Sequence, residues 1–133
     1  MRLIVFFSFI GWIALISLSC GKPKPKKFPN KRSEMAIAMR EMSDALILTK
    51  KSILGNKSQP LKFKTFKNKK FTEESFNTTW FGSMADLLIL NANKFDNNQT
   101  IESFNDVVAG CQSCHENTCP GPLDQIQQLY FSK

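Results

Sequence analysis

The chain has little histidine and no apolar stretch of comfortable transmembrane length. Its 133 residues include one histidine, His115, and four cysteines. A single histidine excludes catalytic sites that pair two imidazoles. The longest apolar run, residues 3–18, is shorter than the roughly 20 residues that span a bilayer comfortably. No internal repeat is visible, so nothing in the sequence indicates a repeat architecture.

The first nineteen residues have the features of a secretory signal. Arg2 provides a short positive start, and the apolar run that follows leads to the small residue Ser19. Residues 18–21, Leu-Ser-Cys-Gly, resemble a bacterial lipobox, in which the cysteine is acylated and becomes the new N-terminus. We therefore predict a signal peptide over residues 1–19 and lipidation at Cys20. The alternatives are an ordinary signal cut nearby and an uncleaved anchor.

Basic and acidic residues are unevenly distributed. Residues 22–70 contain 15 basic and 3 acidic side chains, whereas residues 71–133 contain 2 basic and 8 acidic ones. The Lys/Pro-rich segment 20–32 favours extended conformations, so we predict a tether there and one domain over residues 33–133. We interpret the basic half as a solvated tail and face; otherwise it sits on anionic lipid or docks an acidic redox partner. Nucleic acid is a poor third choice for an exported protein.

Helical periodicity dominates the start of the domain. Ser33 is suited to cap a helix whose apolar seam has the heptad-like spacing of a bundle helix and which ends at Gly55. That seam comprises Met35, Met39, Met42, Leu46, Thr49 and Ile53. Residues 58–71 are compatible with an edge strand, with a basic loop that has aromatic anchors, or with a short irregular helix.

Two further long helices and a short closing helix follow. Thr72, before two acidic residues, predicts a second helix start, and the Asn-rich stretch 91–98 predicts its end. The seam of this helix comprises Phe76, Trp80, Met84, Leu87 and Asn91, with Phe81, Leu88 and Phe95 beside it. Thr100 caps the next helix, which ends before the prolines and glycine of residues 119–122. Its apolar stripe comprises Ile101, Phe104, Val108, Cys111 and His115. Residues 123–130 predict the closing helix.

Cys111, Cys114 and His115 form a C-x-x-C-H pentapeptide, the signature of covalent haem attachment. Two cysteine sulfurs bond to the vinyl groups of a haem, and the adjacent histidine supplies an axial nitrogen to iron. Positions i, i+3 and i+4 of a helix lie on one face, so all three side chains can meet one flat macrocycle. We therefore predict one haem c, with Cys111 and Cys114 as thioethers and His115 as the proximal iron ligand.

The motif lies near the C-terminus, behind a Met-bearing first helix, and this placement resembles the class II c-type cytochromes, the cytochrome c-prime superfamily. The resemblance covers residues 33–116 and implies an all-α four-helix bundle, although the family's second helix has no clear counterpart here. Residues 119–122, Cys-Pro-Gly-Pro, are also similar to the sequence after the motif in small lipid-anchored haem proteins. Low-spin members of the superfamily take a sixth ligand from a first-helix methionine. That implies Met39 here, with Met35 and Met42 as the other candidates.

Two other interpretations of the cysteines remain open. A Cys₃His zinc site would add Cys119 to the three motif residues, although adjacent Cys and His ligands make tetrahedral closure awkward. A thiol–disulfide oxidoreductase would use the two motif cysteines, but no β-α-β pattern surrounds them. Cys119 has no intramolecular disulfide partner left, so we expect a buried, inert thiol rather than a redox or intermolecular role.

From these features we expect an exported, lipid-anchored monohaem c-type cytochrome that carries single electrons between redox partners of the cell envelope. It would be an electron carrier rather than an enzyme, held at the membrane by its N-terminal lipid and facing the periplasm. The alternative is a haem-based module that binds or senses a small gas molecule at an open distal site. The distal ligand distinguishes the two functions, because a bound methionine closes the iron to gases.

Overall fold

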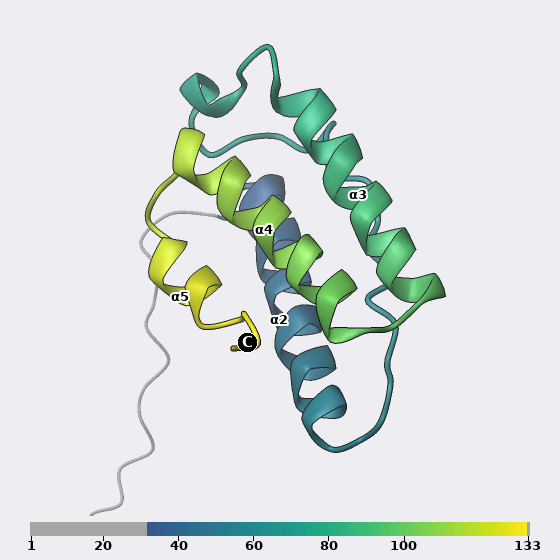
Figure 1. Cartoon of the computed structure of the whole chain (residues 1–133). Helices are drawn as coiled ribbons and strands as arrows, with labels where there is room; N and C mark the ends of the chain where they lie inside the picture. Colours follow the sequence, from purple (N-terminus) through teal and green to yellow (C-terminus); the bar gives the residue numbers. More distant parts are fainter. Residues whose placement is uncertain (1–31, 133) are drawn as a thin grey trace, which may run out of the picture. The chain divides into compact units, whose positions relative to one another are not determined.

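The computed structural model describes residues 32–132, and this part of the chain is all-α, as predicted (Figure 1). Its elements are α2 (Glu34–Leu54), the 3₁₀ turn η1 (Glu74–Phe76), α3 (Phe81–Asn97), α4 (Ile101–Asn117) and α5 (Leu123–Gln127). No strand occurs within residues 32–132, and none of their helices combines the length and apolar character needed to cross a bilayer. The predicted signal peptide, Cys20 and the tether up to Lys31 lie outside the described residues.

Helix α2 begins and ends where its capping residues predict. Ser33 Oγ accepts a hydrogen bond from the Ala36 amide at 3.0 Å, and the Gly55 amide donates to the Lys51 carbonyl at 3.1 Å. These bonds satisfy backbone groups that have no partner within the terminal turns of a helix. The buried residues of α2 are Met35, Met42, Leu46 and Thr49, all from the predicted seam. The first helix and its inward face are therefore confirmed.

The connection between α2 and α3 contains a loop with apolar anchors where a four-helix bundle would have its second long helix. Leu61 and Phe66 are buried there, so of the three conformations left open, the loop is the one that forms. Asp96 of α3 holds the loop, because its carboxylate accepts hydrogen bonds from the amides of Leu61 at 2.6 Å and Lys62 at 2.9 Å. Residues 32–132 thus contain three long helices and the short α5.

The far end of this loop is joined to the N-terminus of α2. The Met35 amide donates to the Lys70 carbonyl at 3.0 Å, and the Lys70 amide donates to Glu34 Oε2 at 3.2 Å. Ser33 and Thr72 share a hydrogen bond between their hydroxyls at 2.8 Å. Thr72 therefore supports α2 and does not cap a helix of its own. The helix start predicted at Thr72 is wrong.

Helix α3 begins at Phe81, and its buried face lies one residue further along the chain than the predicted seam. Its buried residues are Phe81, Ala85, Leu88, Ala92 and Phe95, so three residues expected beside the seam belong to the core itself. Leu87 is 47% exposed, whereas Leu88 is 5% exposed. The predicted seam was extended from Phe76 and Trp80, which precede the helix and therefore do not share its faces. One residue corresponds to a rotation of about 100° around a helix, enough to exchange the faces.

Helix α4 carries the most deeply buried part of the core. Thr100 forms the predicted N-cap, in a reciprocal capping box with Ser103. The fully buried side chains of α4 are Phe104, Val107 and Val108. Phe104 meets Phe95 of α3 edge to face, with ring centroids 5.7 Å apart. Ile101 is 49% exposed, so its predicted place in the apolar stripe is wrong. Ile101 is the first residue of α4 and lies just beyond Asn97, the last residue of α3.

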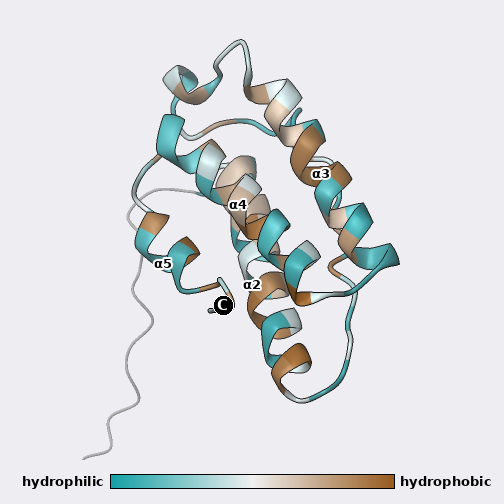
Figure 2. Ribbon diagram, viewed as in Figure 1, coloured by the Kyte–Doolittle hydropathy of each residue, from teal (hydrophilic) through white to brown (hydrophobic). Residues whose placement is uncertain are grey.

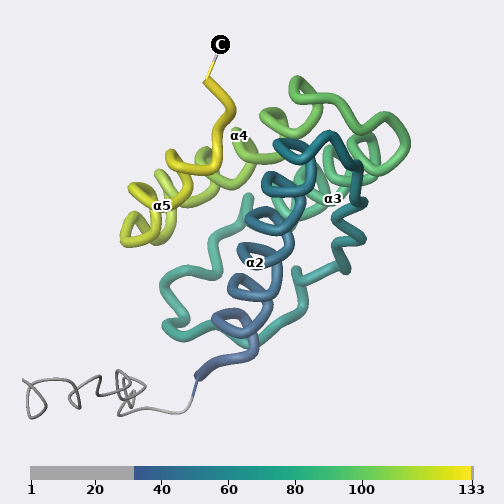
Figure 3. The backbone as a smooth tube through the Cα atoms, turned by 90° about the horizontal axis from the view of Figure 1, so that it is seen from below, coloured from purple at the N-terminus to yellow at the C-terminus, as the bar shows by residue number. Residues whose placement is uncertain are grey.

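The helices are packed at unequal distances. The close backbone pairs within residues 32–132 are α3 with α4 and α4 with α5, whereas α2 stands further from α4. Helix α4 lies in front of α2 in Figure 1 and above it in Figure 3. Apolar and hydrophilic residues alternate along the long helices, as in helices that bury one face (Figure 2). Residues of both α2 and α4 line a cavity.

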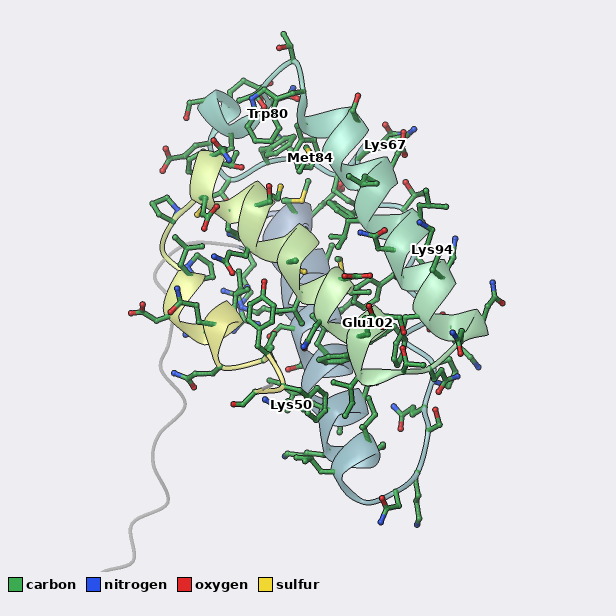
Figure 4. The ribbon with its side chains drawn as sticks, in the orientation of Figure 1. Lys50, Lys67, Trp80, Met84, Lys94 and Glu102 are labelled. Carbon is green, nitrogen blue, oxygen red and sulfur yellow. The ribbon has the colours of Figure 1, made fainter. Side chains whose placement is uncertain are left out.

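Two polar side chains hold the C-terminal segment against the long helices. Lys50 of α2 (Figure 4) donates from Nζ to the carbonyls of Gln128 at 2.9 Å and Tyr130 at 2.8 Å. The Asn105 side chain of α4 exchanges two hydrogen bonds with the backbone of Phe131, at 3.0 and 3.2 Å. These bonds keep α5, the predicted closing helix, in place against α4.

We expect the Asp96→Ala substitution to lower the free energy of unfolding by about 2–3 kcal/mol. It removes the acceptor of two loop amides, of which the exposed Lys62 amide can turn to water. The expected loss is therefore close to that of the part-buried Leu61 bond alone, since a hydrogen bond to a charged group contributes about 1.5–3 kcal/mol. Urea denaturation measures the difference.

Asp86→Ala on the same helix is the matched control. Asp86 forms an ion pair with Lys67 at 2.9 Å between largely exposed side chains, and such pairs contribute less than about 1 kcal/mol. Equal losses in the two variants would contradict the anchoring role of Asp96.

Candidate haem site

The C-terminal half of α4 places Cys111, Cys114 and His115 on the wall of one cavity. The cavity has a volume of about 520 Å³, within the range of small-molecule and cofactor sites. The three residues stand at positions i, i+3 and i+4 of a continuous helix, so their side chains leave it on the same side. The motif is therefore presented to a common space, as its spacing predicts.

The opposite wall of the cavity comes from α2. Met35, Met39 and Met42 all line it, and so does Leu46. Met35 and Met42 are each 8% exposed and belong to the buried core, whereas Met39 is only partly buried. The fold thus brings the three candidate distal ligands into the same cavity as the proximal motif, from a helix about 70 residues earlier in the chain.

The remaining walls are predominantly apolar. Aromatic side chains of the connection between α2 and α3 form one side, and aliphatic side chains of α5 and its flanks form another. They include Phe66, Phe71, Phe76, Ile126 and Leu129. No aspartate or glutamate lines the cavity, and Arg40 is the one lysine or arginine on its wall among the described residues. The cavity suits a large apolar molecule.

His115 has a hydrogen-bond partner that the sequence did not reveal. Its Nδ1 lies 2.8 Å from the backbone carbonyl of Cys119, just after α4 ends. Because a carbonyl can only accept, this contact favours the neutral tautomer with the proton on Nδ1, in which Nε2 has a free lone pair. Metal-binding histidines are commonly fixed in this way by a carbonyl at the other ring nitrogen. The available signal was that Pro120 and Pro122 end the helix, which leaves the Cys119 carbonyl outside its hydrogen-bond ladder.

The three described cysteines are free thiols. Burial raises the pKa of the Cys111 thiol to about 12, and the neighbouring Cys114 adds to the shift. Burial also raises the pKa of Cys114, against the opposing effect of its hydrogen bond with Thr118. A thiol–disulfide oxidoreductase needs a nucleophilic cysteine with a lowered pKa, so this pair lacks the required property.

The alternative zinc site lacks a suitable set of ligands. A structural zinc ion needs four side chains that converge in a tetrahedron. Within residues 32–132, no group of three or more His, Cys, Asp and Glu side chains is arranged to hold an ion.

The residues of the cavity fit a covalently attached haem in three respects. First, two thiols and an imidazole are spaced for attachment on the α4 wall. Second, methionine side chains line the α2 wall. Third, aromatic and aliphatic groups bound the space between these walls. The neutral Nδ1–H tautomer of His115 leaves the nitrogen that iron requires. The side chains available to bind iron are thus a histidine imidazole and a methionine sulfur, which is one of the usual pairs of haem ligands.

Comparisons of the chain with protein-family models, with curated proteins and with solved structures find no match. The likeness to class II cytochromes therefore rests on the motif and its placement in the chain.

We expect ¹⁵N NMR of the haem-free chain at alkaline pH to find His115 in the Nδ1–H tautomer, because the Cys119 carbonyl accepts that proton. The assignment needs no mutagenesis, since His115 is the single histidine of the sequence. Cys119→Ala is the control and should leave the tautomer unchanged, because it preserves the backbone carbonyl. A predominant Nε2–H tautomer would contradict this geometry.

Proposed function

We propose that this chain is a monohaem c-type cytochrome that carries single electrons. The observation that carries the proposal is that one apolar cavity has Cys111, Cys114 and His115 on one wall and Met39 on the other. A pentapeptide alone is a short sequence pattern. A cavity that joins it to thioether side chains from a distant helix gives the pattern the surroundings that the chemistry needs.

Each residue has a defined task in this proposal. Cys111 and Cys114 hold the haem through thioether bonds, and His115 binds iron through Nε2 while the Cys119 carbonyl fixes its ring. When bound, haem c supplies an iron that takes up and releases one electron. The apolar walls exclude water from the iron, and a low local dielectric is one of the means by which a protein sets a reduction potential.

Met39 is the proposed sixth ligand. Met35 and Met42 flank it on the same helix face, but both are buried in the core, where Met commonly fills space. Met39 is less buried although it lines the same cavity, so its thioether is the one least occupied by core packing. A methionine ligand raises the reduction potential and closes the iron to gases, which favours electron transfer.

The cellular setting of the proposal rests on the sequence. Lipidation at Cys20 would hold the protein at the cell envelope, and the segment up to Lys31 would act as a tether that lets the domain reach redox partners in the periplasm. Covalent haem attachment in bacteria takes place outside the cytoplasm, as the c-type family implies, so the proposed export and the proposed cofactor agree. We propose an electron carrier rather than an enzyme.

We expect Met39→Ala to remove the weak far-red charge-transfer band of the ferric protein and to lower its reduction potential, because the iron loses a thioether ligand. Met84→Ala is the matched control: Met84 stands near the start of α3 and does not line the cavity (Figure 4). Absorption spectra and redox titration of both variants measure the effect.

An unchanged spectrum in the Met39 variant would contradict the assignment of Met39. Loss of the band in a Met35 or Met42 variant would move the ligand to that residue. A wild-type ferric spectrum without the band would instead favour the gas-binding alternative, because the distal side of the iron would then be open.

We expect the double substitution of Cys111 and Cys114 by Ala to abolish covalent haem attachment, because no thioether can then form. Cys119→Ala is the control, and it should keep the full haem content, because only the backbone carbonyl of that residue is used. Haem content after denaturation and acid–acetone extraction distinguishes covalent from loosely bound haem. Loss of haem in the Cys119 variant alone would assign its thiol a role in attachment.

A further inference from the structure

Arg40 stands out on the cavity wall because of its charge. The wall is apolar except for a few hydroxyl and amide groups, the three thiols, His115 and this guanidinium. No carboxylate side chain of the described residues faces the cavity from α2, from the α2–α3 connection, from α4 or from α5. Among the described residues, Arg40 is therefore the one permanently charged side chain on the cavity wall.

The position of Arg40 is at the margin of the cavity. Its side chain is exposed, and Nη1 donates to the Ala36 carbonyl, one turn back on the same helix, at 3.3 Å. Ala36 also lines the cavity, so the guanidinium is held along its wall on the α2 side. Arg40 directly follows Met39, which places the charge beside the proposed distal ligand.

We infer that Arg40 binds a carboxylate of the haem and thereby sets which edge of the macrocycle lies at the open margin of the cavity. The inference rests on the proposed function. A haem has an apolar ring and two carboxylates, so it matches an apolar cavity with one cation at its margin. A guanidinium can pair with a carboxylate through two parallel hydrogen bonds, which fixes orientation as well as proximity.

A cation beside the haem also affects its redox equilibrium. Reduction adds one negative charge to the haem, and a nearby positive charge stabilises the reduced state. The loss of Arg40 should therefore lower the reduction potential and leave a carboxylate without its partner. Arg40 acts here as a positioning residue and not as an iron ligand.

The test compares Arg40→Gln and Arg40→Lys with Arg32→Gln in the haem-loaded full-length protein. Arg32 and Arg40 are the two arginines of the described residues, and Arg32 is exposed and does not line the cavity. We expect Arg40→Gln to shift the one-electron equilibrium toward the oxidised form about tenfold, which corresponds to about 59 mV. Arg40→Lys should retain most of the potential because it keeps the charge, and Arg32→Gln should have little effect.

Resonance Raman spectra of the haem carboxylate bending modes provide a second readout, which a purely structural role of Arg40 would not move. These modes should shift in the Gln variant of Arg40 and stay unchanged in the Gln variant of Arg32. Equal potentials and equal carboxylate modes in these two Gln variants would overturn the inference, and so would identical behaviour of Arg40→Gln and Arg40→Lys.

If Arg40→Gln does not accumulate, the wild-type protein still tests the inference. In the ferrous form, which is diamagnetic when the iron has a methionine as its sixth ligand, NMR should detect a nuclear Overhauser contact between the Arg40 side chain and the methylene protons of a haem carboxylate arm. Absence of that contact would overturn the inference. A protein without covalent haem refutes the proposed function itself, whereas a haem-loaded protein with these negative results refutes only the role of Arg40.

Discussion

The packing of α4 against α3 determines which way the C-x-x-C-H motif faces. Phe104, Val107 and Val108 are completely buried in the first half of α4, and they fix the rotation of the helix about its axis. Because α4 is continuous from Ile101 to Asn117, the same rotation places Cys111 and His115, which continue the stripe of Phe104 and Val108, on the wall of the cavity. The apolar core thus orients chemical groups that contribute little to that core themselves.

The cavity exists because α2 does not pack closely on α4. The loop anchored by Asp96 and Lys70, together with α5, fills the sides of the gap and holds α2 at this distance. Lys50 fastens the C-terminal segment to α2, so α5 closes one side of the cavity.

Local signals in the sequence were sufficient for much of this arrangement. The caps at Ser33 and Thr100, the seam of α2 and the end of α4 depend on neighbouring residues, and the structure has them as predicted. The motif and the methionine seam also followed from spacing alone, and the fold places both on one cavity.

Features that depend on distant contacts could not be predicted. Thr72 has the sequence of a helix cap, but Ser33, 39 residues earlier, engages its hydroxyl, so α3 begins at Phe81 and its buried face changes. Cys119 contacts the His115 ring through its backbone carbonyl, and a motif made of side-chain types cannot reveal a backbone contact. The place of Arg40 on the cavity wall depends on the separation of α2 and α4, which periodicity does not determine.

Covalent haem attachment can be measured by mass spectrometry on the tryptic peptide that carries the motif. No lysine or arginine lies between Lys94 and Lys133, so residues 95–133 form one peptide that contains all three described cysteines. We expect this peptide from the purified protein to carry the added mass of one haem and to have a single alkylatable thiol, at Cys119. A peptide without haem and with three alkylatable thiols would contradict this expectation.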